Sequence, residues 1–176
     1  MRSNFALFMT AAVVLAAAPQ QFQLNLDSLA SKASNVVDVS LSGATLKFAA
    51  RFLDSGDPEE ADVKKLIGGL QGIYIKNFEF KNDKAWTQAD LDPIRNQLKG
   101  PAWQRIIGVK NEDGENSEVY LHVEGDKNTG IAILVAEPRE VTVINIVGPI
   151  DLEQLAGLGG HFDVPKFRIP KKEKQK

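Results

Sequence analysis

The sequence predicts an α+β domain of two layers, in which a mainly antiparallel sheet of about five to six strands carries helices on one face, after an N-terminal signal peptide. Two observations predict this class. Several segments before residue 100 repeat apolar side chains at helical spacing, whereas from Trp103 onward the apolar period is two. The connections between the later segments are short enough for hairpins, which indicates a meander of neighbouring strands.

The first residues have the layout of a secretory signal. Arg2 precedes an apolar run over residues 6–18, which ends in small side chains. This run is shorter than the roughly 20 residues that a membrane span needs. We therefore expect a signal peptide over 1–17, cleaved after Ala16 or Ala17, and the alternative is a retained N-terminal anchor. Because the chain contains no cysteine for a lipid anchor, a periplasmic or secreted protein is expected.

The rest of the chain divides by charge. Residues 18–165 have the length of a single domain, and residues 166–176 carry six of the 21 basic residues but only one of the 23 acidic ones. This basic tail suits an anionic lipid surface or an acidic protein, and a solvated, disordered end is the alternative. We expect an envelope protein as a partner, and no nucleic acid, because the chain is exported.

Short helices surround one strand at the start of the predicted domain. The strand covers 36–41, where Val37, Val39 and Leu41 alternate with polar residues, so it is expected to be half-buried. A helix precedes this strand, and an amphipathic helix follows it after Gly43. The apolar positions of the two helices are Leu26, Leu29, Ala30 and Ala33, and then Thr45, Phe48, Ala49 and Phe52.

A second amphipathic helix is expected to begin at an acidic cluster. Asp57 suits the N-cap, Pro58 the first helical position and Glu60 the reciprocal cap. With neither the spacing nor the central glycine of a calcium loop, these acids are not interpreted as a metal site. The apolar stripe of this helix is Val63, Leu66, Ile67 and Leu70.

A strand and a third helix come next. Residues 73–80 are rich in β-branched and aromatic side chains, which is typical of a strand. The helix is expected to begin between Thr87 and Asp90, because Pro93 is tolerated only in a first turn, and Gly100 stops it. Its buried side chains are Leu91, Ile94 and Leu98.

Four strands are predicted after this helix, over 103–110, 118–124, 131–137 and 141–147, with connections at 113–114, 125–130 and 138–139. The last two strands are apolar on both faces and are expected at the centre of the sheet. In the strand over 118–124, one face is expected to be solvated, because Val119, Leu121 and Val123 alternate with Tyr120, His122 and Glu124. A final short helix over 151–158 is expected to bury Leu152, Leu155 and Leu158.

Few residues suggest catalysis. His122 shares its predicted strand face with Tyr120 and Glu124, which allows a small acid–base group, but a solvated cross-strand row is the expected arrangement. His161 follows the final helix, where a cap or linker is expected rather than a ligand. Ser42 lies at a strand-to-helix turn without the Gly-x-Ser-x-Gly pattern of a nucleophile, so it is expected to cap the helix.

Asn145 interrupts an otherwise apolar strand. A buried amide must find partners or cost about 1 to 3 kcal/mol, and a bond to the backbone of a neighbouring loop is expected rather than a ligand contact. Together these observations predict no catalytic residue, no metal ligand and no cofactor-binding residue.

Four stretches carry a family resemblance. They are VVDVSLSG at 36–43, GIYIKNFEF at 72–80, Trp103 with IIGV at 106–109, and VINIVGPIDL at 143–152. Over roughly residues 26–162 the chain resembles a bacterial envelope family catalogued as domain of unknown function 4252. The resemblance implies a small exported protein, and some members are encoded beside extracytoplasmic-function sigma factors and anti-sigma partners. It implies no site residue, because the family has no assigned site.

Export, the missing catalytic set, the basic tail and the resemblance favour an exported non-enzymatic envelope protein. Such a protein binds a protein or envelope component, with a link to extracytoplasmic stress signalling. The alternative is a periplasmic small-ligand or lipid-binding domain with a cleft between helices and sheet. A cleft of roughly 300 Å³ or more with an apolar lining would favour the alternative. A tightly packed core with a large exposed apolar patch would favour protein binding.

Overall fold

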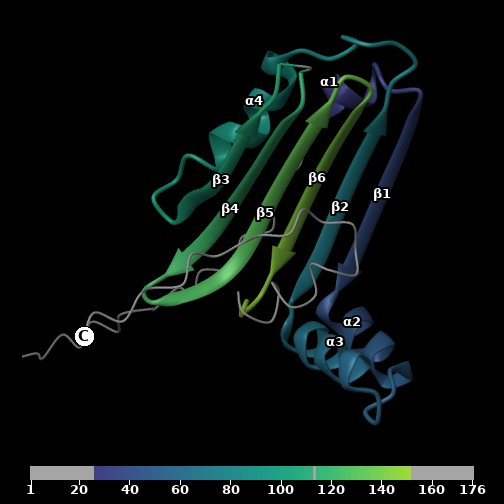
Figure 1. Cartoon of the computed structure of the whole chain (residues 1–176), viewed down its shortest axis with the longest axis vertical. Coiled ribbons are helices and arrows are strands. Elements are labelled where there is room, and N and C mark those ends of the chain that lie inside the picture. The colour runs from purple at the N-terminus through teal and green to yellow at the C-terminus, as the bar shows by residue number, and fades with distance from the viewer. Residues whose placement is uncertain (1–25, 113, 152–176) are drawn as a thin grey trace, which may run out of the picture.

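The computed structural model describes residues 26–112 and 114–151. They contain a six-stranded sheet in the order β1-β2-β6-β5-β4-β3, in which each pair of neighbours is antiparallel (Figure 1). This confirms the predicted α+β class with a mainly antiparallel sheet. The strands are β1 (Asn35–Ser42), β2 (Gly72–Glu79), β3 (Trp103–Lys110), β4 (Asn116–Glu124), β5 (Lys127–Glu137) and β6 (Glu140–Val147).

The last four strands form the predicted meander, and β6 and β5 occupy the predicted central positions. The sheet extends beyond the meander because β2 pairs with β6, with Ile75 opposite Ile144. Strand β1 then pairs with β2 at the edge. The predicted connection over 125–130 is wrong, since β5 already begins at Lys127. Backbone pairing with β4 extends past the apolar alternation, and a register shift after His122 accommodates it.

The four α-helices of the described residues lie at two ends of the sheet (Figure 1). Towards the upper end in this view are α1 (Asp27–Ala30) and α4 (Gln88–Gln97). At the lower end are α3 (Pro58–Gly69) and α2 (Gly43–Ala49), which continues into a short 3-10 helix, η1 (Ala50–Phe52). Helices α1 and α4 cover one face of the sheet, whereas α2 and α3 pack mainly on each other beyond β1 and β2.

The main core lies between the sheet and the pair α1 and α4. Leu29, Leu91 and Ile94 are almost completely buried there, which confirms the predicted apolar stripe of α4. The sheet contributes side chains that share one face by register, because residues directly opposite each other point to the same side. Those most deeply buried are Phe78, Val141, Val143, Leu134 and Ala136.

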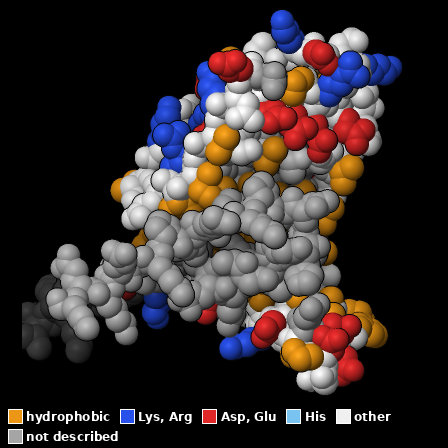
Figure 2. All heavy atoms as spheres, in the orientation of Figure 1, with side chains coloured by type: hydrophobic (Ala, Val, Ile, Leu, Met, Phe, Trp, Pro, Cys, Tyr) orange, Lys and Arg blue, Asp and Glu red, His pale blue; other side chains and the backbone are white. Residues whose placement is uncertain are grey.

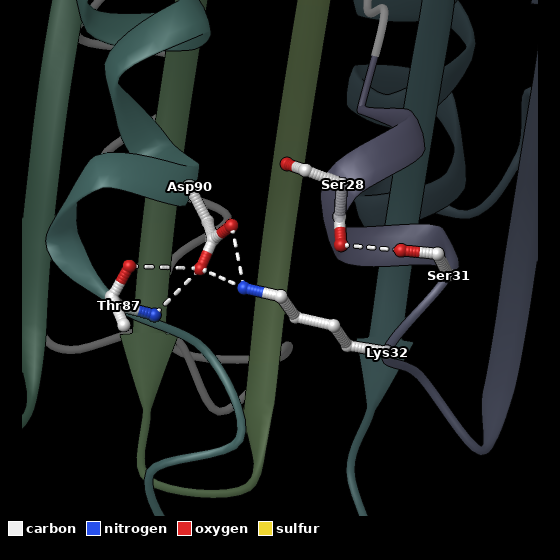
Figure 3. Close-up of polar contacts among 5 residues, drawn as sticks. All are labelled: Ser28, Ser31, Lys32, Thr87 and Asp90. Atoms are coloured by element: carbon white, nitrogen blue, oxygen red, sulfur yellow. Dashed lines mark hydrogen bonds and ion pairs between the residues drawn. The ribbon is translucent and has the colours of Figure 1, made fainter.

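A polar contact joins α1 to the start of α4 (Figure 3). The Asp90 carboxylate accepts hydrogen bonds from the backbone N–H of Thr87 at 2.7 Å and from its hydroxyl at 3.0 Å. The Lys32 ammonium, just after α1, donates to both Asp90 oxygens at 2.8 and 2.7 Å. Burial raises the pKa of Asp90, but these bonds from Lys32 and Thr87 outweigh it and hold the pKa below 3.8. The predicted start of α4 is therefore confirmed, and an ion pair fixes its position.

Helix α2 turns a different face inward from the predicted one. Leu46 and Ala50 are buried, whereas Phe48 and Phe52 are 58% and 76% exposed, so the predicted stripe of Thr45, Phe48, Ala49 and Phe52 is wrong. The rotation of α2 is set at its first residue, because the Gly43 N–H donates to the Gln71 carbonyl at 2.7 Å. This places Leu46 against Leu70, directly after α3.

The predicted helix caps fit the structure with one change. The Thr45 N–H donates to Ser42 Oγ at 3.3 Å, and the Glu60 N–H donates to Asp57 Oδ1 at 3.1 Å. The Glu60 carboxylate accepts from the Asp54 N–H at 2.6 Å, so it reaches back beyond the N-cap residue.

Strand β1 is more exposed than predicted. Val36 and Val37 are both more than two fifths exposed, because β1 is an edge strand with a single neighbour and none of the described helices covers this part of it. Residues 152–158 of the predicted final helix, His161, the signal peptide over 1–17 and the basic tail over 166–176 lie outside the described residues. Of the helices that the structure describes, none is long and apolar enough to cross a membrane.

Candidate functional site

A cleft of about 450 Å³ opens between α4 and the sheet edge formed by β3 and β4. It extends along α4 from Gln88 to Arg95, a helical rise of about 10 Å, and beyond the helix to Leu98 and Lys99. Most of its lining residues carry a polar or charged group. They are Gln88, Arg95, Leu98, Lys99, Arg105, Lys110, Asn116, Glu118 and Tyr120.

A network of four side chains lines the cleft. The Arg95 guanidinium donates to Glu118 Oε1 through Nε at 2.9 Å and through Nη2 at 2.6 Å. The Tyr120 hydroxyl donates to the other carboxylate oxygen of Glu118. The remaining guanidinium nitrogen, Arg95 Nη1, donates to Gln88 Oε1 at 2.7 Å. The network joins the last turn of α4 to β4.

Charge and burial fix the protonation states of this network. Burial raises the pKa of Glu118, but the hydrogen bond from Tyr120 and the bonds and charge of Arg95 outweigh it and hold the pKa below 4.5. Burial, together with the bond to Glu118, raises the pKa of Tyr120 to about 12. At neutral pH Glu118 is therefore ionised and Tyr120 keeps its proton, so neither is suited to exchange a proton near pH 7.

The cleft carries an excess of positive charge. Arg95, Lys99, Arg105 and Lys110 line it together with a single carboxylate, Glu118. Arg95 is neutralised by that carboxylate. Arg105, Lys99 and Lys110 form no ion pair with a carboxylate among the described residues. Three positive charges therefore line a concave surface. Concave walls of low dielectric strengthen the attraction for an anion.

The structure corrects the predicted environment of His122. His122 and Tyr120 are 7% and 8% exposed, so this face of β4 is buried and the predicted solvated row is wrong. The Tyr120 ring belongs to the core beneath α4. The His122 ring lies against Trp103, with ring centroids 4.8 Å apart, and its Nδ1 is 2.8 Å from Thr129 Oγ1. Glu124, the third residue of the row, is exposed.

His122→Ala is therefore expected to destabilise the protein by about 1 to 3 kcal/mol, because it leaves Thr129 without this bond and opens space beside Trp103. The measurement is the free energy of unfolding in urea, compared with Gln104→Ala at an exposed position of β3. If His122 were dispensable, as the predicted solvated row implies, His122→Ala and Gln104→Ala would change the free energy of unfolding by the same small amount.

Asn145 is 1% exposed, as its position in a central strand suggested. Its amide Nδ2 donates to the Ile131 carbonyl at 3.4 Å, and this partner belongs to strand β5. Near it, Trp103, His122 and Thr129 surround a void of about 10 Å³, room for about one water molecule. This void is too small for a ligand.

A separate apolar feature lies at the lower end of the molecule. Phe48 and Phe52 contact each other edge to face on the outside of α2 and η1, with ring centroids 5.2 Å apart. Figure 2 shows hydrophobic side chains gathered over α2 and α3. Two exposed rings form a small patch, so this feature meets only part of the expectation for a protein-binding surface.

No sequence pattern predicts the cleft. The one local signal was the spacing of Glu118 and Tyr120, which places them on one face of a strand. Arg95 approaches them only after α4 packs on the sheet. Of the other candidates, Ser42 caps α2 as predicted, and in the described part of the chain no group of three His, Asp or Glu side chains could hold a metal ion.

These features define a small antiparallel α+β domain with a basic cleft at one edge of its sheet. The family model described as domain of unknown function (DUF4252) matches residues 30–158. The chain belongs to this family, which confirms the resemblance. No curated protein and no solved structure matches the chain significantly.

Proposed function

We propose that the protein is an exported, non-enzymatic binding protein of the bacterial envelope, which holds an anionic group of a protein or other envelope component in the cleft beside α4. The observation that carries this proposal is a set of three cations, Lys99, Arg105 and Lys110, which line about 450 Å³ of space and form no ion pair with another described residue. A link to extracytoplasmic stress signalling rests on the resemblance alone.

The alternative is a periplasmic small-ligand or lipid-binding domain. The volume of the cleft favours it, because ligand sites measure about 300 to 1,000 Å³. The lining opposes a lipid chain, since four of its nine residues are cations and one is a carboxylate. A small anionic ligand fits the same charges. After cross-linking to the protein, it would add far less mass than a protein partner.

Photo-cross-linking in intact cells tests this function. Gln88, at the rim of the cleft, is replaced with p-benzoyl-phenylalanine in the full chain, and Ala89, one residue further on and exposed, is the control position. We expect an adduct from position 88 and none from position 89, with mass spectrometry identifying the captured species. Equal adducts from both positions, or none from position 88, would contradict the proposal.

Charge reversal then tests the chemistry. Arg105→Glu with Lys110→Glu is expected to reduce the adduct about tenfold or more, because like charges would face the anionic group. The matched control reverses two exposed lysines of α2 and α3, Lys47→Glu with Lys65→Glu, and is expected to leave the adduct unchanged. An equal loss in both variants would show that net charge, and not the cleft, determines capture.

A further inference from the structure

The face of the sheet opposite α1 and α4 is apolar across its central strands. By register, two rows of side chains run across it. One is Ile75, Ile144, Ile133 and Val119, and the other is Ile73, Ile146, Ile131 and Leu121. From the described helical regions, only Leu46 of α2 and Leu70, directly after α3, join the apolar cluster on this face. A sheet face of this composition needs a cover, since otherwise it would promote association.

The chain turns onto this face at residues 148–150, directly after β6. Gly148 has a φ of 135°, and a side chain there would bring Cβ within 2.9 Å of the Leu70 backbone, so only glycine fits this turn. Beyond it, the Ile150 N–H donates to the Asn128 carbonyl at 3.0 Å, beside the start of β5. Ile150 is 7% exposed and belongs to the same cluster as Leu121 and Ile131.

The residues that follow have the pattern of a cover. Leu152, Leu155 and Leu158 recur every three residues, so a helix would carry them on one side. Seven helical residues extend about 10 Å, enough to cross about two strands at a spacing of about 4.8 Å. The family match ends at residue 158, so this segment belongs to the family's domain and not to the basic tail.

We propose that residues 152–158 lie across this second face of the sheet and cover it, with their leucines packed on the row that contains Ile133 and Ile144. The occupant of the face is thus the chain's own segment and not a second copy or a lipid. The proposal is independent of the function assigned to the cleft, which lies on the other face.

The absence of cysteine from the chain allows a direct test in the full-length protein. Cysteines are introduced as Ile133→Cys with Leu155→Cys and joined by a short bismaleimide. We expect a cross-link within one chain. The control pair, Ala89→Cys with Leu155→Cys, places one thiol on α4 at the other side of the sheet and is expected to give none. Cross-links only between chains would assign the face to a second copy of the protein. If no cross-link forms, residues 152–158 do not lie on this face.

A second measurement tests the leucines themselves. In the single variant Ile133→Cys, the thiol is expected to react slowly with a maleimide. Changing Leu152, Leu155 and Leu158 together to serine is expected to raise the rate at least about tenfold, as the cover is released. Glu153→Ser with Gln154→Ser is the control and is expected to leave the rate unchanged. The same rate in all three proteins, with the circular dichroism spectrum preserved, would overturn the proposal.

Discussion

Leu91→Ala is expected to lower the free energy of unfolding by about 2 to 5 kcal/mol, because the leucine is 0% exposed and its loss leaves a cavity between α4 and the sheet. Domains of this size are stable by about 5 to 15 kcal/mol, so a large share of the stability would be lost. The measurement is urea unfolding of the full chain, followed by far-ultraviolet circular dichroism.

Asp92→Ala is the matched control, one residue along the same helix and exposed. We expect it to change the stability by no more than about 0.5 kcal/mol. If both variants unfold alike, α4 does not pack on the sheet as described, and the cleft that α4 forms with β3 and β4 loses its support.

The second large effect is expected in the network that lines the cleft. Arg95→Met leaves the buried Glu118 carboxylate without its cation, and this should cost about 2 to 3 kcal/mol at neutral pH. Arg139→Met is the control, because its partner Asp83 is well exposed and such pairs contribute about 0 to 1 kcal/mol. Equal costs would show that the Arg95 pair is solvated.

The pH dependence of this loss is a second signature. The folded pKa of Glu118 lies below 4.5, so the stability that the network contributes is present above pH 4.5 and disappears as the pH falls through the lowered folded value. Once Glu118 is protonated in both proteins, the missing cation no longer matters. The difference between wild type and Arg95→Met is therefore expected to narrow below pH 4.5, and a difference that stays constant down to acid unfolding would contradict the assignment.

Replacing the carboxylate as well completes this test. Arg95→Met with Glu118→Gln is expected to be more stable than Arg95→Met alone at neutral pH, because no buried charge is left without a partner. If the double variant is the less stable of the two, Arg95 stabilises the helix by packing and not by pairing with Glu118.

The local patterns of the sequence predict most of the strands and helices. The period of two after Trp103 predicts β3 to β6 and their meander, because short connections leave antiparallel neighbours as the simple arrangement. Caps behave in the same way, since Ser42 and Asp57 bond to backbone groups three residues away. Such interactions depend only on residues that are close along the chain.

The sequence by itself thus determined the α+β class, the central position of β5 and β6 and the buried stripe of α4. Tertiary structure alone decided that both faces of β4 are buried, which side of α2 turns inward and which cations gather at the cleft. Alternation predicted one solvated face of β4, but the packing of α4 buries Tyr120 on that face. Arg95 contacts Glu118 only when α4 is packed on the sheet. No periodicity along the chain encodes such a contact between a helix and a strand that follows it in the sequence.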